Sequence, residues 1–469
     1  MSFTKIVATL GPTSDTYEKI VELGEAGVDV FRLNFSHGTH EHYAGVIKSI
    51  HRINKNFGKN YSIMLDTKGP EIRSADLKAP IKLEDNQEII LSVDTVEYEK
   101  TGKIQVNYEA FIDDIEEKEI ILIDNGIMKL EVVKKKGRDI ICRVVEGGEL
   151  GSRRHINLPM KEASLEPITK KDWRDIEFGV EHGVDFFALS FVRDGKEVER
   201  LRNFLKEKGS RAHIISKIES FEATKNLDYI VQVSDGVMVA RGDLGAEVPF
   251  SSVPRLQREI LHISAQYRKI SIVATHMLES MIENPMPTRA EATDISNAVW
   301  QRSDAIMLSG ETANGAYPRK SVEIMREVAD VSEEDCLKER KTRERASILN
   351  DREEIAHLAA QIPRDCSDVA GIMVVTRSGY MARMISSFRP CAPILAFTNE
   401  TFSRRYMNLL WGVKPYLIDF SSDPEKTISR ACTQLLKKNP TWENKKIVLI
   451  ADSLVDGKFV PEIQIRTID

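Results

Sequence analysis

The chain has 469 residues, of which 42% are hydrophobic and 29% charged, a balance that excludes collagen-like and disordered chains. This length exceeds what one hydrophobic core supports, so we expect two to four domains. The net charge of −6 comes from interleaved acids and bases, which disfavours nucleic acid as a partner. We also expect no membrane span, no signal peptide and a cytoplasmic location, because apolar runs are short and the five cysteines are scattered.

Short apolar runs of strand length alternate with longer segments of helical period, which is the pattern of parallel βα units. The first three predicted strands lie at 5–11, 28–36 and 61–67. Five more lie at 184–191, 212–219, 236–243, 270–277 and 304–310. Eight strands close a parallel barrel with its helices outside. We therefore predict an α/β fold in which residues 1–68 and 167–338 form a (β/α)8 TIM barrel.

Two further domains interrupt and follow this barrel. Between residues 69 and 166 the apolar runs lie closer together, with Gly, Asp and Lys turns between them, which predicts a small antiparallel β-barrel lid domain inserted after the third strand. The charge run at 333–347 predicts a solvated helix and a domain boundary. The segment 339–469 then alternates strands and helices again, which predicts a C-terminal open α/β domain.

Polar residues gather where the predicted barrel strands end, which is where barrel enzymes place their active sites. These residues are Arg32, Asn34, Ser36, Asp66, Thr67, Lys68, Lys217, Glu219, Arg241, Asp243, Thr275, Glu311 and Thr312. One mouth of the barrel thus combines acids, bases and small oxygen donors.

Glu219 and Asp243 follow neighbouring strands, so their carboxylates can converge on one hard cation such as magnesium. Taken singly, each is as readily a solvated loop acid. Lys217 lies two residues before Glu219 and leaves the strand on the same face, where an anionic substrate would have to relieve the buried charge. Together with Arg32 and Arg73, this cationic surround predicts phosphoryl transfer.

Two weaker signals accompany this group. Gly242 and Gly245 in RGDLGAEVP predict a turn whose backbone N–H groups bind a carboxylate. The second signal is a set of neutral and anionic oxygens that suits a monovalent cation, although local capping explains it as well. That set is Asn34, Ser36, Asp66 and Thr67.

An ordered set of longer strings then resembles the signatures of the pyruvate kinase family over essentially the whole chain. The strings are TKIVATLGPTS, RLNFSHG, LDTKGPEIR, SKIES, SDGVMVARGDLGAE, ATHMLESM, NPMPTRAEATDISNAV and IMLSGETANGAYP. The resemblance implies that phosphoenolpyruvate and ADP become pyruvate and ATP with the help of Mg²⁺ or Mn²⁺ and K⁺. It also implies a lid that closes over the substrates, a homotetramer, and a phosphorylated effector at the C-terminal domain.

The resemblance carries roles to individual residues of this chain. The implied catalytic residues are Lys217, Arg32, Arg73 and Thr275, with Lys217 stabilising the transferring phosphoryl group. The implied substrate contacts are Arg32, Lys217, Gly242, Asp243 and Thr275. The implied nucleotide contacts are Asn34, His37, Arg73 and Arg154. Glu219 and Asp243 would hold the divalent cation, and potassium would be held by Asn34, Ser36, Asp66 and Thr67. Glu71 stands where other members of the family have Lys, and in the family Glu at this position accompanies dependence on potassium.

Four features depart from the family pattern. His276 stands where the family usually has Gln, and Arg154 stands in SRRHINLP where a Lys often meets the nucleotide phosphate. In the C-terminal domain, TRSGYMAR has Met381 where Ser or Thr commonly helps to hold phosphate. The final segment 452–468 lacks the usual Gly-Thr-rich turn. The identity of the effector therefore does not follow from the sequence.

Two other functions compete with this interpretation. The first is a metal-dependent barrel lyase or aldolase that acts on pyruvate or phosphoenolpyruvate and needs no nucleotide. The second is a non-catalytic relative that binds a metabolite. Lys217, Glu219, Asp243 and Thr275 are all present, which favours a working enzyme over the second.

Overall fold

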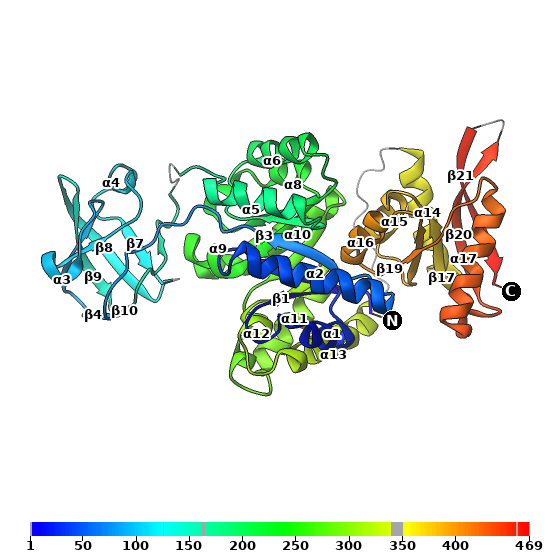
Figure 1. Cartoon of the computed structure of the whole chain (residues 1–469), viewed down its shortest axis with the longest axis horizontal. Helices are drawn as coiled ribbons and strands as arrows, with labels where there is room; N and C mark the ends of the chain where they lie inside the picture. The colour runs from blue at the N-terminus through cyan, green and yellow to red at the C-terminus, as the bar shows by residue number, and fades with distance from the viewer. Residues whose placement is uncertain (1, 125, 162–164, 339–349, 456–457, 469) are drawn as a thin grey trace.

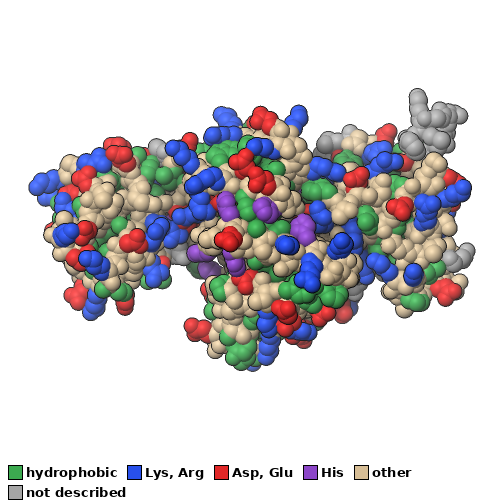
Figure 2. Space-filling model, in the orientation of Figure 1, with side chains coloured by type: hydrophobic (Ala, Val, Ile, Leu, Met, Phe, Trp, Pro, Cys, Tyr) green, Lys and Arg blue, Asp and Glu red, His purple; other side chains and the backbone are tan. Residues whose placement is uncertain are grey.

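The three parts of the molecule lie in a row in this computed structural model, with the barrel between the inserted lid and the C-terminal domain (Figure 1). The structure describes residues 2–124, 126–161, 165–338, 350–455 and 458–468. Within these residues, no helix combines the length and the apolar character that crossing a bilayer requires. Acidic and basic side chains alternate over the face seen in Figure 2, as the interleaved sequence predicts.

The barrel is closed by parallel strands in the order β1-β16-β15-β14-β13-β12-β3-β2. Its strands are β1 (Lys5–Leu10), β2 (Val30–Asn34), β3 (Ser62–Asp66), β12 (Phe186–Leu189), β13 (His213–Ile218), β14 (Gly236–Ala240), β15 (Ile270–Ala274) and β16 (Ala305–Leu308). Each lies within one of the eight predicted runs. The barrel prediction is therefore confirmed.

Amphipathic helices cover the outside of the barrel. The longer ones are α1 (Tyr17–Ala26), α2 (His40–Phe57), α5 (Lys170–Glu181), α6 (Gly195–Glu207), α10 (Val253–Gln266), α11 (Arg289–Trp300) and α13 (Pro318–Lys338). Shorter helices lie in the connections between strands and helices: α7 (Phe221–Lys225), α8 (Leu227–Val233), α9 (Arg241–Glu247), α12 (Gly310–Ala313), η1 (Phe250–Ser252) and η2 (Glu279–Ile282). Threonine side chains cap several of these helices, and Thr169 and Thr288 form capping boxes with Asp172 and Glu291.

Alternate barrel strands begin after an aspartate at the end opposite the predicted site. These residues are Asp29, Asp185, Asp235 and Asp304, and each accepts a hydrogen bond from the second backbone N–H of the preceding strand. Two of the four also form ion pairs with arginines of the C-terminal domain, Asp185 with Arg405 at 2.6 Å and Asp304 with Arg389 at 2.9 Å. The same aspartates thus fix the strands and dock the neighbouring domain.

The inserted segment folds into a six-stranded sheet and a two-stranded sheet around its own apolar core. Its elements are β4 (Ile81–Leu83), β5 (Glu88–Ser92), α3 (Tyr98–Thr101), β6 (Lys103–Gln105), α4 (Phe111–Asp114), β7 (Ile120–Ile123), β8 (Met128–Lys136), β9 (Asp139–Glu146), β10 (Gly148–Leu150) and β11 (Ile156–Asn157). The pairing is antiparallel except between β5 and β6, which run parallel. The α3 turn between those two strands allows this crossover, which the sequence prediction did not include.

The C-terminal domain is a five-stranded sheet in the order β19-β18-β17-β20-β21, parallel except for the last pair. Its elements are α14 (Asp351–Asp365), β17 (Val369–Val375), α15 (Tyr380–Ser387), β18 (Ile394–Thr398), α16 (Thr401–Tyr406), η3 (Met407–Leu409), β19 (Val413–Leu417), α17 (Pro424–Lys438), η4 (Pro440–Trp442), β20 (Lys446–Val455) and β21 (Lys458–Thr467). One buried cluster joins barrel residues such as Met64 and Ile215 to Ile385 and Leu409 of this domain. The domain therefore seals one end of the barrel.

The predicted solvated helix at 333–347 is only partly borne out. Its first residues continue α13, and Glu333 is buried because its carboxylate accepts hydrogen bonds from the backbone N–H groups of Phe3 and Thr4. A charged side chain in a charge-rich run can thus accept hydrogen bonds from the backbone just before β1 instead of being solvated. The remainder of that run, from 339 onward, lies outside the described residues.

Candidate active site

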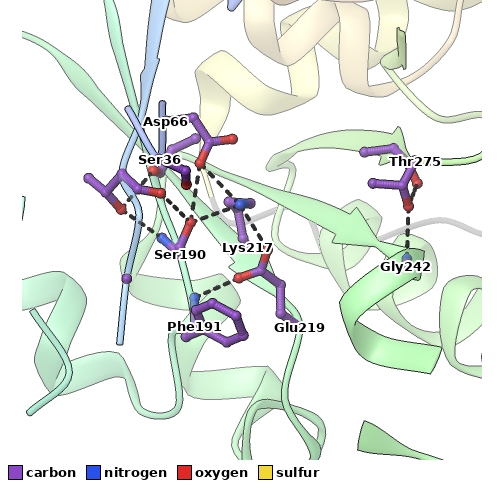
Figure 3. Close-up of polar contacts among 12 residues, drawn as sticks. Ser36, Asp66, Ser190, Phe191, Lys217, Glu219, Gly242 and Thr275 are labelled. Atoms are coloured by element: carbon purple, nitrogen blue, oxygen red, sulfur yellow. Dashed lines mark hydrogen bonds and ion pairs between the residues drawn. The ribbon is translucent and has the colours of Figure 1, made fainter. Parts of the chain in front are cut away.

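Lys217 lies at the centre of a buried polar cluster at the open end of the barrel (Figure 3). Its Nζ lies 3.0 Å from Asp66 Oδ1, 2.8 Å from Ser190 Oγ and 2.8 Å from Glu219 Oε1. Burial disfavours the ammonium, but Asp66 and Glu219 outweigh this cost and raise the pKa of Lys217 above its usual value. The side chain is therefore a permanent cation held among fixed acceptors.

Asp66 holds a second cation beside Lys217. The Arg32 guanidinium donates from Nε to Asp66 Oδ2 at 2.6 Å and from Nη1 to Thr9 Oγ1 at 2.9 Å. Although burial raises the pKa of a carboxyl group, Arg32 and Lys217 bring the pKa of Asp66 below its usual range. Asp66 thus stays ionised and fixes two cations where an anionic substrate can meet them.

Glu219 and Asp243 form a pair of carboxyl groups that repel each other. Glu219 is fully buried, accepts a hydrogen bond from Phe191 N at 2.7 Å, and uses its other oxygen for the ion pair with Lys217. Burial raises the pKa of Glu219 to about 7, and the charge of Asp243 adds to the rise. Burial likewise raises the pKa of Asp243. Such a pair gains from a cation between its members.

These carboxyl groups fit a divalent cation that shares its ligands with a substrate. Their oxygens are the hard donors that Mg²⁺ and Mn²⁺ prefer. Within the described ranges, no group of three or more acid, histidine or cysteine side chains could hold a metal on its own. A cation at Glu219 and Asp243 would therefore complete its shell with water and substrate oxygens.

The four oxygen-bearing residues predicted for a monovalent cation come from adjoining strand ends. Asn34 and Asp66 are direct partners across the β2–β3 pair, and Asn34 Oδ1 accepts a hydrogen bond from Ser36 N at 3.2 Å. Thr67 Oγ1 accepts from Ser190 N at 3.0 Å. One carboxylate among neutral oxygens is a donor set that fits a monovalent cation, while the Asn34 contact also serves as the local cap that the sequence left open.

The predicted turn at Gly242 is instead the first turn of α9, a helix in which neither Gly242 nor Gly245 has a positive φ. Gly242 N donates to Thr275 Oγ1 at 2.8 Å (Figure 3). Thr275 and His276 have φ angles of 66° and 54°, which are strained for side-chain-bearing residues and most of all for a β-branched one. Arg241 holds this bend by donating to Thr275 O at 2.5 Å.

The remaining predicted residues lie around the rim. Arg73, in the connection to the lid, donates to both oxygens of Glu71 at 2.7 and 2.9 Å, which raises the pKa of Arg73, and Asp243 adds to that rise. Arg154 is exposed on the lid, with Nη1 3.4 Å from Asp124 Oδ2. His37 is exposed on the loop between β2 and α2. The structure thus brings Arg73 within the field of Asp243 and leaves Arg154 and His37 open to solvent.

Ser190 and Phe191, at the end of β12, belong to this cluster although the sequence analysis did not single them out. Ser190 Oγ contacts Lys217 and Asp66, and Phe191 N donates to Glu219. Their signal was positional only, because they follow β12 at the barrel mouth in the way that Glu219 follows β13. An aromatic residue that contributes its backbone carries no chemical signature in the sequence.

Comparison with known proteins supports this arrangement. A family model described as pyruvate kinase, barrel domain, matches residues 1–322, and one described as pyruvate kinase, alpha/beta domain, matches residues 353–458. The chain belongs to the pyruvate kinase family. It is 45% identical over 95% of its length to pyruvate kinase isozyme G, chloroplastic, of Nicotiana tabacum, covering 80% of that protein. It is 41% identical over 97% of its length to the pyruvate kinase of Bacillus licheniformis, covering 78%. The resemblance seen in the motifs is confirmed, and the chain is a phosphotransferase.

The departures from the pyruvate kinase pattern have structural settings. The His276 ring lies against Gly242, since a Cβ added to that glycine would come 3.4 Å from His276 Cε1. Met381 is buried in α15 and packs into the core that joins the barrel to the C-terminal domain. A side chain committed to that core cannot reach out to a phosphate as Ser or Thr would, which separates this loop from the common pattern of pyruvate kinases.

Glu247 links the lid to the barrel and makes the stability of the protein depend on pH. Asn157 Nδ2 donates to Glu247 Oε1 at 2.7 Å, and burial raises the pKa of Glu247 to about 7. Because the folded protein keeps this proton more tightly than the unfolded chain, the stabilisation is complete below pH ~4.5 and is lost as pH rises through ~7. We expect Glu247→Gln to raise the midpoint of thermal unfolding by a few degrees at pH 8 and to leave it unchanged at pH 4.5. An equal shift at both pH values would contradict this assignment.

Proposed function

We propose that the chain transfers the phosphoryl group of phosphoenolpyruvate to ADP, giving pyruvate and ATP in glycolysis. The supporting observation is the buried ammonium of Lys217 between Asp66 and Glu219, with Arg32 on the far side of Asp66. A transferring phosphoryl group spreads negative charge over its equatorial oxygens. Preorganised cations stabilise that charge without reorganising during the reaction.

Each residue of the cluster then has a distinct task. Lys217 and Arg32 would bind the phosphoryl oxygens, and Arg73 would contact them from the lid connection. Thr275 would lie beside the enolate carbon, its hydroxyl oriented by Gly242 N and by its own short bond to Ala274 O at 2.7 Å. Gly242 N already donates to Thr275 Oγ1. The substrate carboxylate would therefore accept a hydrogen bond from the neighbouring backbone N–H of Asp243 on α9.

The nucleotide would lie between the barrel rim and the lid. We assign its contacts to Asn34, His37, Arg73 and Arg154. His37 and Arg154 are exposed and thus accessible to phosphate oxygens. Closure of the lid would bring Arg154 toward the rim and exclude water from the reacting groups.

Glu219 and Asp243 would hold Mg²⁺ or Mn²⁺, which supplies a Lewis acid that polarises the phosphate and enolate oxygens. Asn34, Ser36, Asp66 and Thr67 would hold K⁺. We expect activity to fall at least about tenfold when KCl is replaced by tetramethylammonium chloride. The tetramethylammonium ion is too large to enter a site whose oxygen ligands come from two adjacent strand ends. Sodium and rubidium chlorides at equal ionic strength serve as controls. An unchanged rate in tetramethylammonium would remove the potassium site from the proposal.

A coupled assay with lactate dehydrogenase tests the reaction itself. We expect pyruvate to form only when phosphoenolpyruvate, ADP, Mg²⁺ and K⁺ are all present. Turnover without ADP would favour the metal-dependent lyase or aldolase instead. A folded protein that binds phosphoenolpyruvate without turnover would favour the non-catalytic relative.

We further propose a homotetramer in the cytoplasm with a phosphorylated effector at the C-terminal domain. The support for the tetramer is the membership of the chain in the pyruvate kinase family. Of the named relatives, the Nicotiana tabacum enzyme is chloroplastic and the Bacillus licheniformis enzyme is bacterial. Sedimentation measures the assembly, and titration of sugar phosphates and AMP against activity identifies the effector.

A further inference from the structure

Ser190 is a buried serine at the end of β12 whose side chain faces Lys217 (Figure 3). Its Oγ lies 2.8 Å from Lys217 Nζ, 2.7 Å from Thr67 O and 3.2 Å from Asp66 Oδ1. The hydroxyl thus lies between the ammonium assigned to phosphoryl transfer and two residues assigned to the monovalent cation. It connects the two proposed sites through direct contacts.

The single proton of this hydroxyl fixes the direction of its bonds. Lys217 can only donate, so the serine must offer it a lone pair. The hydroxyl proton is then left for an acceptor, and Thr67 O at 2.7 Å is closer than Asp66 Oδ1 at 3.2 Å. Because the carbonyl of Thr67 orients the O–H bond, the lone pair on Oγ points toward Lys217 at a set angle.

The position of Ser190 is itself determined by close packing. Ser190 N donates to Thr67 Oγ1 at 3.0 Å, and Gly69 lies so near that an added Cβ would be 2.9 Å from Ser190 Cβ. Phe191 follows with a φ of 51° and donates its N–H to Glu219. One tight turn therefore places the serine against Lys217 and a backbone donor against Glu219.

When the divalent cation and the substrates bind, Lys217 depends more on the hydrogen bond that Ser190 accepts. Three acceptors surround Lys217, and the proposed function assigns one of them, Glu219, to the divalent cation. That assignment leaves Asp66 and Ser190 to hold the ammonium while its third donor faces the phosphoryl group. Asp66 also accepts a hydrogen bond from Arg32. Of the three acceptors, Ser190 is therefore the one that is assigned neither to the divalent cation nor to Arg32.

We propose that Ser190 is a positioning residue for Lys217 in phosphoryl transfer. This inference rests on the role proposed for Lys217. A hydrogen bond from a charged group is worth about ten- to one-hundredfold in rate when it exists only to place that group for the transition state. The loss should appear in kcat and not in the KM for phosphoenolpyruvate, because substrate binding also draws on Arg32 and Arg73.

Ser190→Ala tests the proposal, with Ser216→Ala as the matched control. Ser216 is equally buried and lies on β13 next to Lys217. Its hydroxyl lies 2.6 Å from Ser234 Oγ and makes this hydrogen bond outside the Lys217 cluster. We expect Ser190→Ala to lower kcat about 10- to 100-fold with a KM within about threefold of wild type. Ser216→Ala should change kcat less than about threefold. Equal losses in the two variants, or a kcat within about twofold of wild type in Ser190→Ala, would overturn the proposal.

A double variant distinguishes positioning from a general loss of structure. If Ser190 acts through Lys217, adding Ser190→Ala to Lys217→Met should lower the remaining activity less than about twofold. A loss that multiplies with that of Lys217→Met would overturn the proposal while leaving the reaction assignment intact. If Ser190→Ala fails to fold, Ser190→Cys keeps the shape of the side chain and offers only a weak acceptor, and the same drop in kcat at unchanged KM is expected from it.

Discussion

Lys217→Met is expected to lower kcat by about a thousandfold or more while the protein stays folded. The variant replaces the ammonium by an apolar group of similar length, so Asp66 and Glu219 lose their shared cation and the phosphoryl group loses its nearest charge. Removing one preorganised donor to a developing charge costs about 100- to 1000-fold in other enzymes. Here the donor carries a full charge in a buried site, which places the expected loss at or above the top of that range.

Lys269→Met is the matched control for this experiment. Lys269 lies at the opposite end of the barrel, just before β15, and its Nζ donates to Gln232 O at 2.8 Å and Ser234 O at 2.5 Å. Burial lowers its pKa to about 8, so it is also a perturbed lysine but has no route to the substrate. The coupled assay should show kcat within a few fold of wild type for Lys269→Met. Near-wild-type turnover by Lys217→Met would refute the assignment of the ammonium.

The sequence predicted the barrel and most of its mouth because both depend on local patterns. Apolar runs of strand length specify the eight strands, and residues just beyond each run must lie at the mouth. Lys217 and Glu219 could be paired from their spacing alone, since residues two apart on a strand share a face. The register that sets Asn34 beside Asp66 follows from the same parallel pairing.

The features that the sequence did not predict depend on contacts between distant segments. Ser190 acquires its meaning from Thr67 and Lys217, which lie 123 and 27 residues away. The buried state of Glu333 depends on the backbone of Phe3 and Thr4, which lie 330 and 329 residues earlier. Residue type alone predicts that Glu333 is solvated and gives no function for Ser190. Their contacts become visible only in the folded barrel, which brings the distant segments together.

Glu219→Gln is expected to raise the Mg²⁺ concentration needed for half-maximal activity by about 100-fold or more. Changing a residue that only supports a metal ligand costs about 10- to 100-fold in metal affinity, and a ligand itself should cost at least as much. The amide keeps the shape of the side chain and the acceptor for Phe191 N, so the backbone turn should survive. Direct Mn²⁺ binding, followed by electron paramagnetic resonance without substrates, gives a readout that does not depend on turnover.

Glu247→Gln is the matched control, since Glu247 is a half-buried acid in α9 that also has its pKa raised to about 7. Its carboxylate is engaged by Asn157, so we expect its removal to change Mn²⁺ affinity less than about threefold. Thermal unfolding in EDTA at pH 8 separates metal binding from folding. Burial raises the pKa of Glu219 to about 7, so the uncharged amide of Glu219→Gln avoids a desolvation cost that offsets the lost ion pair with Lys217, and the midpoint should not fall. Equal Mn²⁺ affinity in wild type and Glu219→Gln would place the divalent cation elsewhere than at Glu219 and Asp243.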